Sequence, residues 1–261
     1  MKPDLAAADL VAYLLRLGDD ALVTAQRLGE WSARAPEMET DIALSNIALD
    51  QLGVARLLLT YAGEVEGAGR DEDTLAYLRG DDEYRNVQLV ELPDEQPGLS
   101  RDFGVTIAKL LCLSAYQHPL YQQLSASADE RIAGIAAKAV KESAYHLDFA
   151  SLWTVRLGDG TRASRERMAG ALAAVWPYTF ELFETDDLVA RVVAAGVGVD
   201  PSTLSRHWSD VVGGVLAMAT LDLPETAWRP TGGRAGRHTE ALSYLLGEMQ
   251  VLHRAHPGAT W

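Results

Sequence analysis

The sequence predicts an all-helical fold, a ferritin-like four-helix bundle with additional helices. Apolar residues recur every three or four positions along most of the chain, which is the period of one helix face, whereas the alternation typical of strands is hard to find. Four long helical segments fall into two antiparallel pairs separated by roughly 37 residues. A ferritin-like bundle has such a long crossover between its helix pairs, and an up-down bundle with short loops does not.

The first pair of long helices is expected at about 19–34 and 37–63, after a short helix at about 4–16. Acidic residues stand near the start of each long helix, where the helix dipole favours negative charge. Pro36 separates the two helices, and Gly67 follows the second one, in a position where glycine commonly ends a helix. These signals together predict a helical hairpin.

A long connection is expected at 86–100, and the second helix pair follows at about 101–126 and 129–157. The segment 223–237 has the composition of an irregular loop. No repeat, low-complexity tract or domain linker is evident, so a single domain covering 1–261 is expected. Shorter helices are expected at about 71–78, 81–85, 162–183, 201–221 and 238–255, with another one opened by Asp186.

The composition is that of a soluble globular protein, with 48% hydrophobic and 23% charged residues. A formal charge of −14 would repel a phosphate backbone, which argues against nucleic acid as a partner. The N-terminal stretch has no cleavage-site pattern, and no apolar run approaches the length that spans a membrane. We therefore expect a cytoplasmic protein that has no membrane partner. The single cysteine, Cys112, lies in an apolar helical run and is expected to be a buried small hydrophobe.

Glu142 and His146 stand one helical turn apart in the stretch KESAYHL, on the apolar face of the helix expected at 129–157. A carboxylate and an imidazole at this spacing are typical of a metal site inside a helical bundle. Ferritin-like di-iron proteins take one Glu from each of two helices and a Glu-x-x-His from each of the other two. The sequence can be checked for this complete ligand set.

The other helices lack the ligands that a di-iron site would need. No histidine lies in residues 1–117, so the first helix pair cannot supply an imidazole. Asp50 could replace a ligand carboxylate, but Gly53 stands where the histidine should be. The third long helix has no Asp or Glu between Phe103 and Ala128, and in the fourth the histidine comes one place late. We therefore expect that this chain does not hold a di-iron centre of its own.

A buried carboxylate must be paired or neutralised, because leaving it bare costs several kcal/mol at least. We expect a core polar cluster in which the first helix pair supplies hydrogen-bond partners to the carboxylate and imidazole of the fourth helix. A bound metal of another kind is the alternative interpretation. Such a cluster would be the vestige of a metal site and would fix the register of the helices. Its expected members are Glu142, His146, Asp50, Asn46 and Glu30.

Gly232 and Gly233 lie beside Arg234 and Arg237, a pattern that suggests an anion site, for example for the phosphates of a coenzyme. No preceding strand and no nucleotide-binding motif accompany them. A flexible loop, or a loop that contacts a partner protein, is the competing interpretation. Arg234 and Arg237 are therefore kept as possible anion or partner contacts.

Several long segments, in the same order, resemble the family of C subunits of bacterial phenylacetyl-CoA epoxidases (ring 1,2-epoxidases), the PaaC family. The resemblance extends over nearly the whole chain, from about residue 9 to the last residue. The segments that carry it are LGEWSARAPEMETDIALSNIALDQLGVARLLLTYA, DEDTLAYLR, KAVKESAYHL and TGGRAGRHTEALSYLLGEMQVL, followed by PG and the closing Trp261.

The resemblance implies a ferritin-like fold and a place in a multicomponent monooxygenase complex. Such a complex epoxidises the aromatic ring of phenylacetyl-CoA in aerobic phenylacetate catabolism, with O2 and with NADPH that acts through a separate reductase subunit. The resemblance further implies that the di-iron centre belongs to the related catalytic A subunit. This chain would then bind no cofactor itself and would be a non-catalytic structural subunit that binds and stabilises the A subunit among the other subunits.

Two other functions stay open at this point, and with them the question of whether the chain alone is an enzyme. The chain could be a di-iron oxygenase or oxidase that is active on its own. It could also be a helper subunit that contacts coenzyme A through the loop at 232–237. If it is a structural subunit, we expect large, apolar-centred interfaces, and self-association when the chain is alone.

Overall fold

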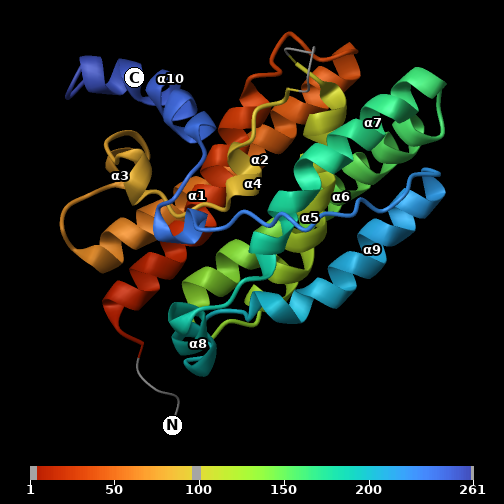
Figure 1. Cartoon of the computed structure of the whole chain (residues 1–261). Coiled ribbons are helices and arrows are strands. Elements are labelled where there is room, and N and C mark those ends of the chain that lie inside the picture. The colour runs from red at the N-terminus through yellow and green to blue at the C-terminus, as the bar shows by residue number, and fades with distance from the viewer. Residues whose placement is uncertain (1–4, 96–100, 260–261) are drawn as a thin grey trace. The chain divides into compact units, whose positions relative to one another are not determined.

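The structure is a computed structural model that describes residues 5–95 and 101–259 (Figure 1). The described residues form helices joined by turns and loops, with no strand among them, which confirms the all-helical prediction. Three expected features fall partly outside the described residues: the start of the first helix at residue 4, the last part of the connection at 86–100, and the closing Trp261.

Contacts group the chain into two compact units, each of which is described by itself. The first unit consists of Met1–Leu92 together with Thr231–Trp261, so it is discontinuous in sequence. The second unit is Pro93–Pro230. The expectation that residues 1–261 act as one domain stays a prediction.

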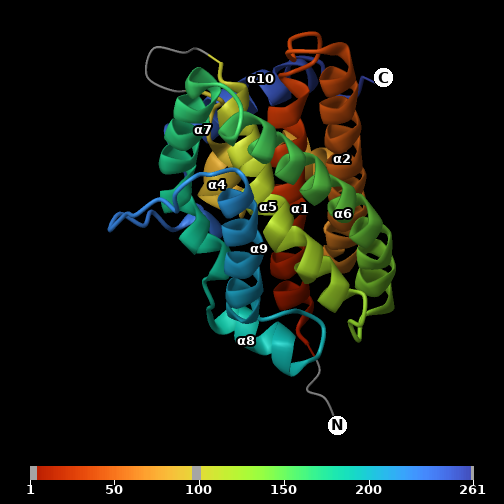
Figure 2. The same ribbon diagram turned by 90° about the vertical axis from the view of Figure 1, so that its right-hand side faces the viewer.

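The first unit is built on α1 (Ala7–Gly29) and α2 (Met38–Glu66), which lie side by side in both views of the chain (Figure 1, Figure 2). The two helices approach closely at Gly18, where a Cβ atom would lie 3.0 Å from Leu59 Cδ2. Large apolar side chains such as Leu44 are completely buried along this pair. The predicted helical hairpin is therefore present, with its two helices packed on an apolar seam.

The prediction of two separate helices at 4–16 and 19–34 is wrong, because α1 runs without a break and ends at Gly29. Asp19 and Asp20 have the composition of a helix start, where acidic side chains are favourable. They lie instead in the middle of α1 and are buried, and arginines from other parts of the unit neutralise them. The local pattern is typical of an N-terminus, but partners distant in sequence determine the outcome.

The end of α2 confirms the prediction made from its glycines. Gly67 caps the helix in the left-handed conformation, with φ of +67°, and its backbone N–H donates to the carbonyl of Gly63. Gly63 itself is required for close packing, since a Cβ there would lie 2.0 Å from the carbonyl oxygen of Arg70. The chain can therefore turn back against its own helix immediately after α2.

Short elements complete the first unit. Part of the connection expected at 86–100 is helical, which corrects that prediction. The last helix, α10 (Glu240–Ala255), begins two residues later than predicted and packs on the short helices of this unit. An acid caps the first of these short helices, where Asp71 accepts a hydrogen bond from the backbone N–H of Thr74. The elements are α3 (Glu72–Tyr77), η1 (Asp81–Glu83), α4 (Gln88–Glu91), η4 (Gly233–Ala235) and α10 (Glu240–Ala255).

The second unit is built on α5 (Phe103–Leu124) and α6 (Glu130–Gly158), which also lie side by side (Figure 1, Figure 2). Each begins with an aspartate cap, because Asp102 accepts from the N–H of Gly104 and Asp129 accepts from two N–H groups of the first turn. Both bounds agree with the predicted helices to within a few residues. The smaller helices of this unit are α7 (Arg162–Val175), α8 (Asp187–Ala194) and α9 (Ser205–Met218).

Two predicted helices of the second unit change type along their length. The helix expected at 162–183 is α-helical only to Val175 and continues as the 3-10 helix η2 (Trp176–Phe183). Pro177 stands in the first turn of η2, and its missing N–H removes one α-helical hydrogen bond at the point where the helix changes type. The helix expected at 201–221 likewise opens as the 3-10 helix η3 (Pro201–Leu204).

Within the described residues, α2 is the one helix with the length and apolar content that crossing a membrane requires. This is weak evidence of a membrane span, because core helices of soluble proteins pass the same test. Only 44% of its most apolar 18-residue window is buried inside the protein. The helix therefore has apolar side chains on its outward face as well as on its packed face.

Candidate functional site

The predicted pair on α6 consists of one buried and one partly exposed side chain. His146 is 2% exposed, as expected for the apolar face of the helix. Glu142 is only partly buried, and its Oε1 lies 2.9 Å from Lys138 Nζ one turn earlier. Its Oε2 is buried and has no hydrogen-bond partner among the described residues. The carboxylate is thus neutralised from one side only, by a largely exposed lysine.

Ser143, next to Glu142, connects α6 to α5. Its Oγ lies 3.2 Å from His118 Nδ1, and His118 Nε2 lies 2.9 Å from Gln122 Nε2. The contact with Ser143 joins α5 to α6, whereas Gln122 lies one turn along α5 from His118. His118 was not among the predicted site residues, because no acid stands one turn from it on α5.

The three residues expected to form hydrogen bonds with Glu142 and His146 lie in the first unit. Glu30 follows the last residue of α1 and is paired with Arg27 at 2.8 Å. Asp50 is partly exposed on α2, and Asn46 is exposed on the same helix. The hydrogen bonds expected between these residues and α6 stay a prediction.

The described residues contain no group of three or more His, Cys, Asp or Glu side chains that could hold a metal ion. A di-iron centre in a ferritin-like bundle needs carboxylates from all of its ligand helices and two imidazoles. One histidine and one carboxylate already paired with lysine do not meet this need. The residues that the structure describes therefore do not fit a di-iron centre.

The strongest electrostatic feature of the first unit is the pair of adjacent acids in α1. The guanidinium of Arg79 is bound to both carboxylate oxygens of Asp19, with Nη1 3.0 Å from Oδ2, and both side chains are buried. The backbone N–H of Arg85 also donates to Asp19 Oδ2, at 2.8 Å. The same Arg79 guanidinium lies over the ring of Tyr84, 4.3 Å from its centroid. This arginine thus ties the segment after α3 to the middle of α1.

The neighbouring acid, Asp20, is bound by an arginine that was predicted to form an anion site. Arg234 Nη2 lies 2.7 Å from Asp20 Oδ2, and Nη1 donates to Oδ1 at 3.0 Å. Arg234 Nη1 also donates to the carbonyls of Arg16 and Arg85. Burial raises the pKa of Asp20 above its ordinary value, and Arg234 opposes that shift. The guanidinium of Arg234 is therefore ion-paired with a carboxylate of α1.

The backbone of this loop explains its glycines. Gly232 and Gly236 both have positive φ, and a Cβ at Gly236 would lie 2.3 Å from the carbonyl oxygen of Asp82. Gln88 Nε2 donates to the carbonyl of Arg237 at 2.9 Å. The side chain of Arg237 is exposed and covers Gly232, so of the two predicted anion-site arginines it alone can meet a solvent-borne anion.

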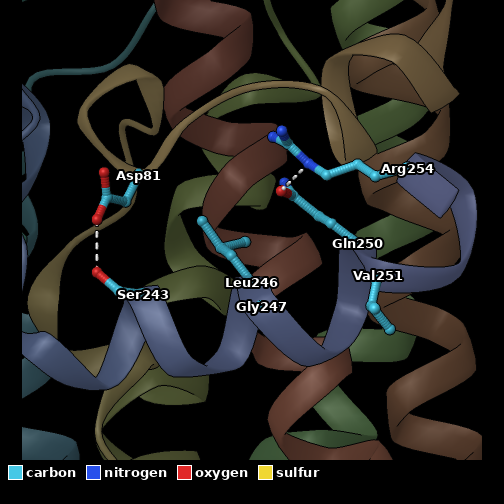
Figure 3. A pocket seen from close by; sticks show the side chains of 7 residues that line it. All are labelled: Asp81, Ser243, Leu246, Gly247, Gln250, Val251 and Arg254. Carbon is cyan, nitrogen blue, oxygen red and sulfur yellow. Dashed lines mark hydrogen bonds between the residues drawn. The ribbon is translucent and has the colours of Figure 1, made fainter.

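A surface cavity of about 410 Å³ lies on the first unit beside α10 (Figure 3). Asp81 and Ser243 are hydrogen-bonded at one end, and Arg254 Nε donates to Gln250 Oε1 at the other. Arg254 and Gln250 also donate to backbone carbonyls of residues 76–79. The hydrogen bond from Ser243 lowers the pKa of Asp81. These polar groups are thus engaged in holding α10 in place, and neither a histidine nor a cysteine lines the cavity.

Comparison with known proteins gives two findings. The model of the family described as "Phenylacetic acid catabolic protein" matches residues 1–261. A protein of Escherichia coli (strain K12), described as the C subunit of 1,2-phenylacetyl-CoA epoxidase, is 45% identical over 252 residues, which cover 97% of this chain and 99% of that protein.

Proposed function

Since the chain belongs to the family of phenylacetic acid catabolic proteins, we propose that it is the C subunit of a phenylacetyl-CoA epoxidase that acts in phenylacetate catabolism. The observation that carries this proposal is the 45% identity to the C subunit of such an enzyme over almost the full length of both chains. We assign the protein to the cytoplasm, with the other epoxidase subunits as its partners.

Within that complex we assign the chain a structural role. The iron ligands would belong to the related A subunit, because the described residues of this chain do not fit a di-iron centre. What this chain supplies instead is rigidity, since the buried Arg79 and the partly buried Arg234 fasten their segments to buried acids in the middle of α1. A rigid partner can hold the ligand helices of an iron-bearing subunit in place, much as surrounding residues orient the ligands of a metal.

Co-purification and metal analysis test this assignment. A tagged form of the chain, co-expressed with the iron-bearing A subunit, is expected to retain that subunit through washing at moderate salt. Oxidation of NADPH that depends on phenylacetyl-CoA should require both chains and the reductase. The chain purified alone is expected to contain far less than one iron per molecule. About two irons per chain would instead support an oxygenase or oxidase active on its own, and would contradict the structural role.

The alternative of a coenzyme-A contact is favoured by one observation, the exposed guanidinium of Arg237. Arg237→Glu is expected to weaken substrate binding by the assembled complex several-fold if this contact exists, with assembly unchanged. Glu240→Gln, at an exposed acid of the same region, is the matched control. Unchanged substrate affinity in Arg237→Glu would remove the alternative. Arg234 does not serve for this test, because its substitution would disrupt the bond to Asp20.

A further inference from the structure

The outward face of α2 carries a row of exposed apolar side chains, which we name the α2 stripe. Exposed fractions within it run from 41% at Leu57 to 76% at Met38. Between these two residues the helix rises about 28 Å, at 1.5 Å per residue. A row of exposed apolar side chains of this length is unusual on a monomer and is typical of an interaction site. The large apolar members of the stripe are Met38, Ile42, Leu49, Leu52 and Leu57.

The spacing of the α2 stripe is that of a coiled-coil seam. Starting at Met38, the outward positions follow in alternating steps of four and three residues, which is the heptad pattern that packs one helix against another. Three apolar side chains, Ile42, Leu49 and Leu52, occupy most of its inner positions. The seam is therefore shaped for a single long helix. Its positions are Met38, Ile42, Ser45, Leu49, Leu52 and Arg56.

We propose that the α2 stripe binds the α2 stripe of a second copy of this chain, with the two helices antiparallel about a two-fold axis. In an antiparallel pair of helices, each seam position packs against the position of the second copy that lies at the same height along the seam, on the other side of the two-fold axis in sequence. Ile42 then meets Leu52 of the second copy, and Leu49 meets Ser45 of the second copy. A small residue thus faces a large one in the central layers, so that the helices can approach closely.

The charges at the two ends of the stripe favour this orientation. Glu37, Glu39 and Asp41 stand at its N-terminal end, and Arg56 stands at its other end. Arg56 Nε is bonded to Glu72 Oε1 at 3.2 Å, which leaves the terminal amino groups of the guanidinium for another acid. An antiparallel second copy would place its Glu39 beside Arg56, whereas a parallel copy would place acids beside acids. The surface is thus electrostatically complementary to itself.

Asn46 lies next to the seam at its centre and is exposed. The two-fold axis of the proposed pairing passes close to this residue, so that each Asn46 faces its counterpart. An amide can donate and accept at once, so such a pair satisfies itself. Another register would place this flanking amide against apolar side chains of the second copy, so Asn46 favours the register described. The pairing is independent of the proposed function, because it requires no iron-bearing partner.

Sedimentation equilibrium of the full chain, purified alone, tests the proposal directly. We expect a dimer with twice the 28.3 kDa mass of one chain. Leu49→Glu should weaken dimerisation by on the order of a hundredfold or more, because the charge enters the seam twice. Leu152→Glu on α6 is the matched control, since Leu152 is as exposed as Leu49, at 67% against 63%, and lies outside the stripe. Circular dichroism establishes that both variants are folded.

Three further variants test the orientation. Arg56→Glu should weaken the dimer and Glu39→Arg in the same chain should restore it, as a charge exchange across the seam requires. Asn46→Cys should form a disulfide between copies under mild oxidation, because the two residues face each other across the axis. The native Cys112 should not compete, since it is buried and burial raises its pKa to about 12.

A monomer at all concentrations would overturn the proposal, and so would a dimer that Leu49→Glu leaves intact. If Leu49→Glu releases the iron-bearing subunit from the complex and leaves self-association unchanged, the occupant of the stripe is that subunit and the proposal fails, while the proposed function stands. If the iron-bearing subunit never co-purifies with the parent chain and the dimer forms as described, the proposed function fails and the stripe proposal stands.

Discussion

The acids on α1 and the acid on α6 show two different ways of placing a carboxylate in a helical protein. Asp19 and Asp20 are buried, and each is bound by an arginine that comes from a distant part of the chain, 60 residues away for Arg79 and 214 residues away for Arg234. Glu142 is paired only with Lys138 on its own helix and leaves one buried oxygen unpaired among the described residues. The first arrangement fixes distant segments to α1, whereas the second leaves the carboxylate neutralised from one side only.

A carboxylate in an apolar helix therefore does not by itself indicate chemistry. In the sequence, Asp19 and Asp20 resemble a helix start and Glu142 lies within an apolar stripe, so neither pattern shows which group neutralises the charge. The two places differ in which groups neutralise the charge, and only the folded chain reveals those groups. Burying a charge is tolerated where the partner is equally buried and well aligned, as for Asp19 and Arg79.

The largest effect is expected from Asp19→Asn. Neutralising one partner of a buried ion pair leaves Arg79 as an uncompensated buried charge, which typically costs about 3–5 kcal/mol of the free energy of unfolding. Urea unfolding followed by circular dichroism measures this loss. Glu166→Gln is the control, because the exposed pair of Arg162 and Glu166 should contribute less than about 1 kcal/mol. Equal losses in the free energy of unfolding for the two substitutions would refute the expected difference between the buried and the exposed ion pair.

A smaller loss, about 2–3 kcal/mol at pH 7, is expected from Arg234→Met, because Arg234 is partly exposed. This variant also tests the pH dependence. The pKa of Asp20 is raised by burial, and removing the opposing arginine should raise it further. A carboxyl group whose pKa is higher in the folded than in the unfolded state adds stability as pH falls through that folded pKa. The deficit should therefore shrink between pH 7 and pH 5 in urea titrations, and a deficit that grows in acid would contradict this reasoning.

The smallest effect is expected from Glu142→Gln. Its ion pair with the largely exposed Lys138 contributes about 0.3–0.5 kcal/mol, and the amide also removes charge from a buried oxygen without a partner. The free energy of unfolding should change by less than about 1 kcal/mol, with either sign. A loss above about 2 kcal/mol would mean that Glu142 has a strong partner, and a double-mutant cycle with Asp50→Asn would then establish whether the predicted cluster exists.

Much of the fold follows from the sequence because its signals are local. The helix pairs come from apolar periodicity, and the end of α2 comes from Gly67, which adopts the left-handed cap that glycine accommodates best. The same locality explains the failures. The pair Asp19-Asp20 resembles a helix start because its arginines are distant in sequence, and the helix after α6 changes type at a proline that the periodicity concealed.

The candidate site is less predictable than the fold. Periodicity places Glu142 and His146 on the inner side of α6, but it does not say how far each side chain is covered, and Glu142 remains partly exposed. Asn46 is predicted in the core and is exposed, because the apolar residues of α2 occur on two faces and the pattern does not distinguish the packed face from the outward one. Arg234 has the features of an anion-binding residue, and its anion is a side chain of the protein itself.

The bond between Arg234 and Asp20 also constrains the order of events during synthesis. During translation α1 emerges early from the ribosome. The arginine that neutralises Asp20 emerges only after every residue of the second unit has been translated. Until then the nascent first unit carries an acid that cannot be buried without cost, so it should remain open to chaperones and proteases while the second unit folds. A premature stop codon before the loop would leave that unit permanently in this incomplete state.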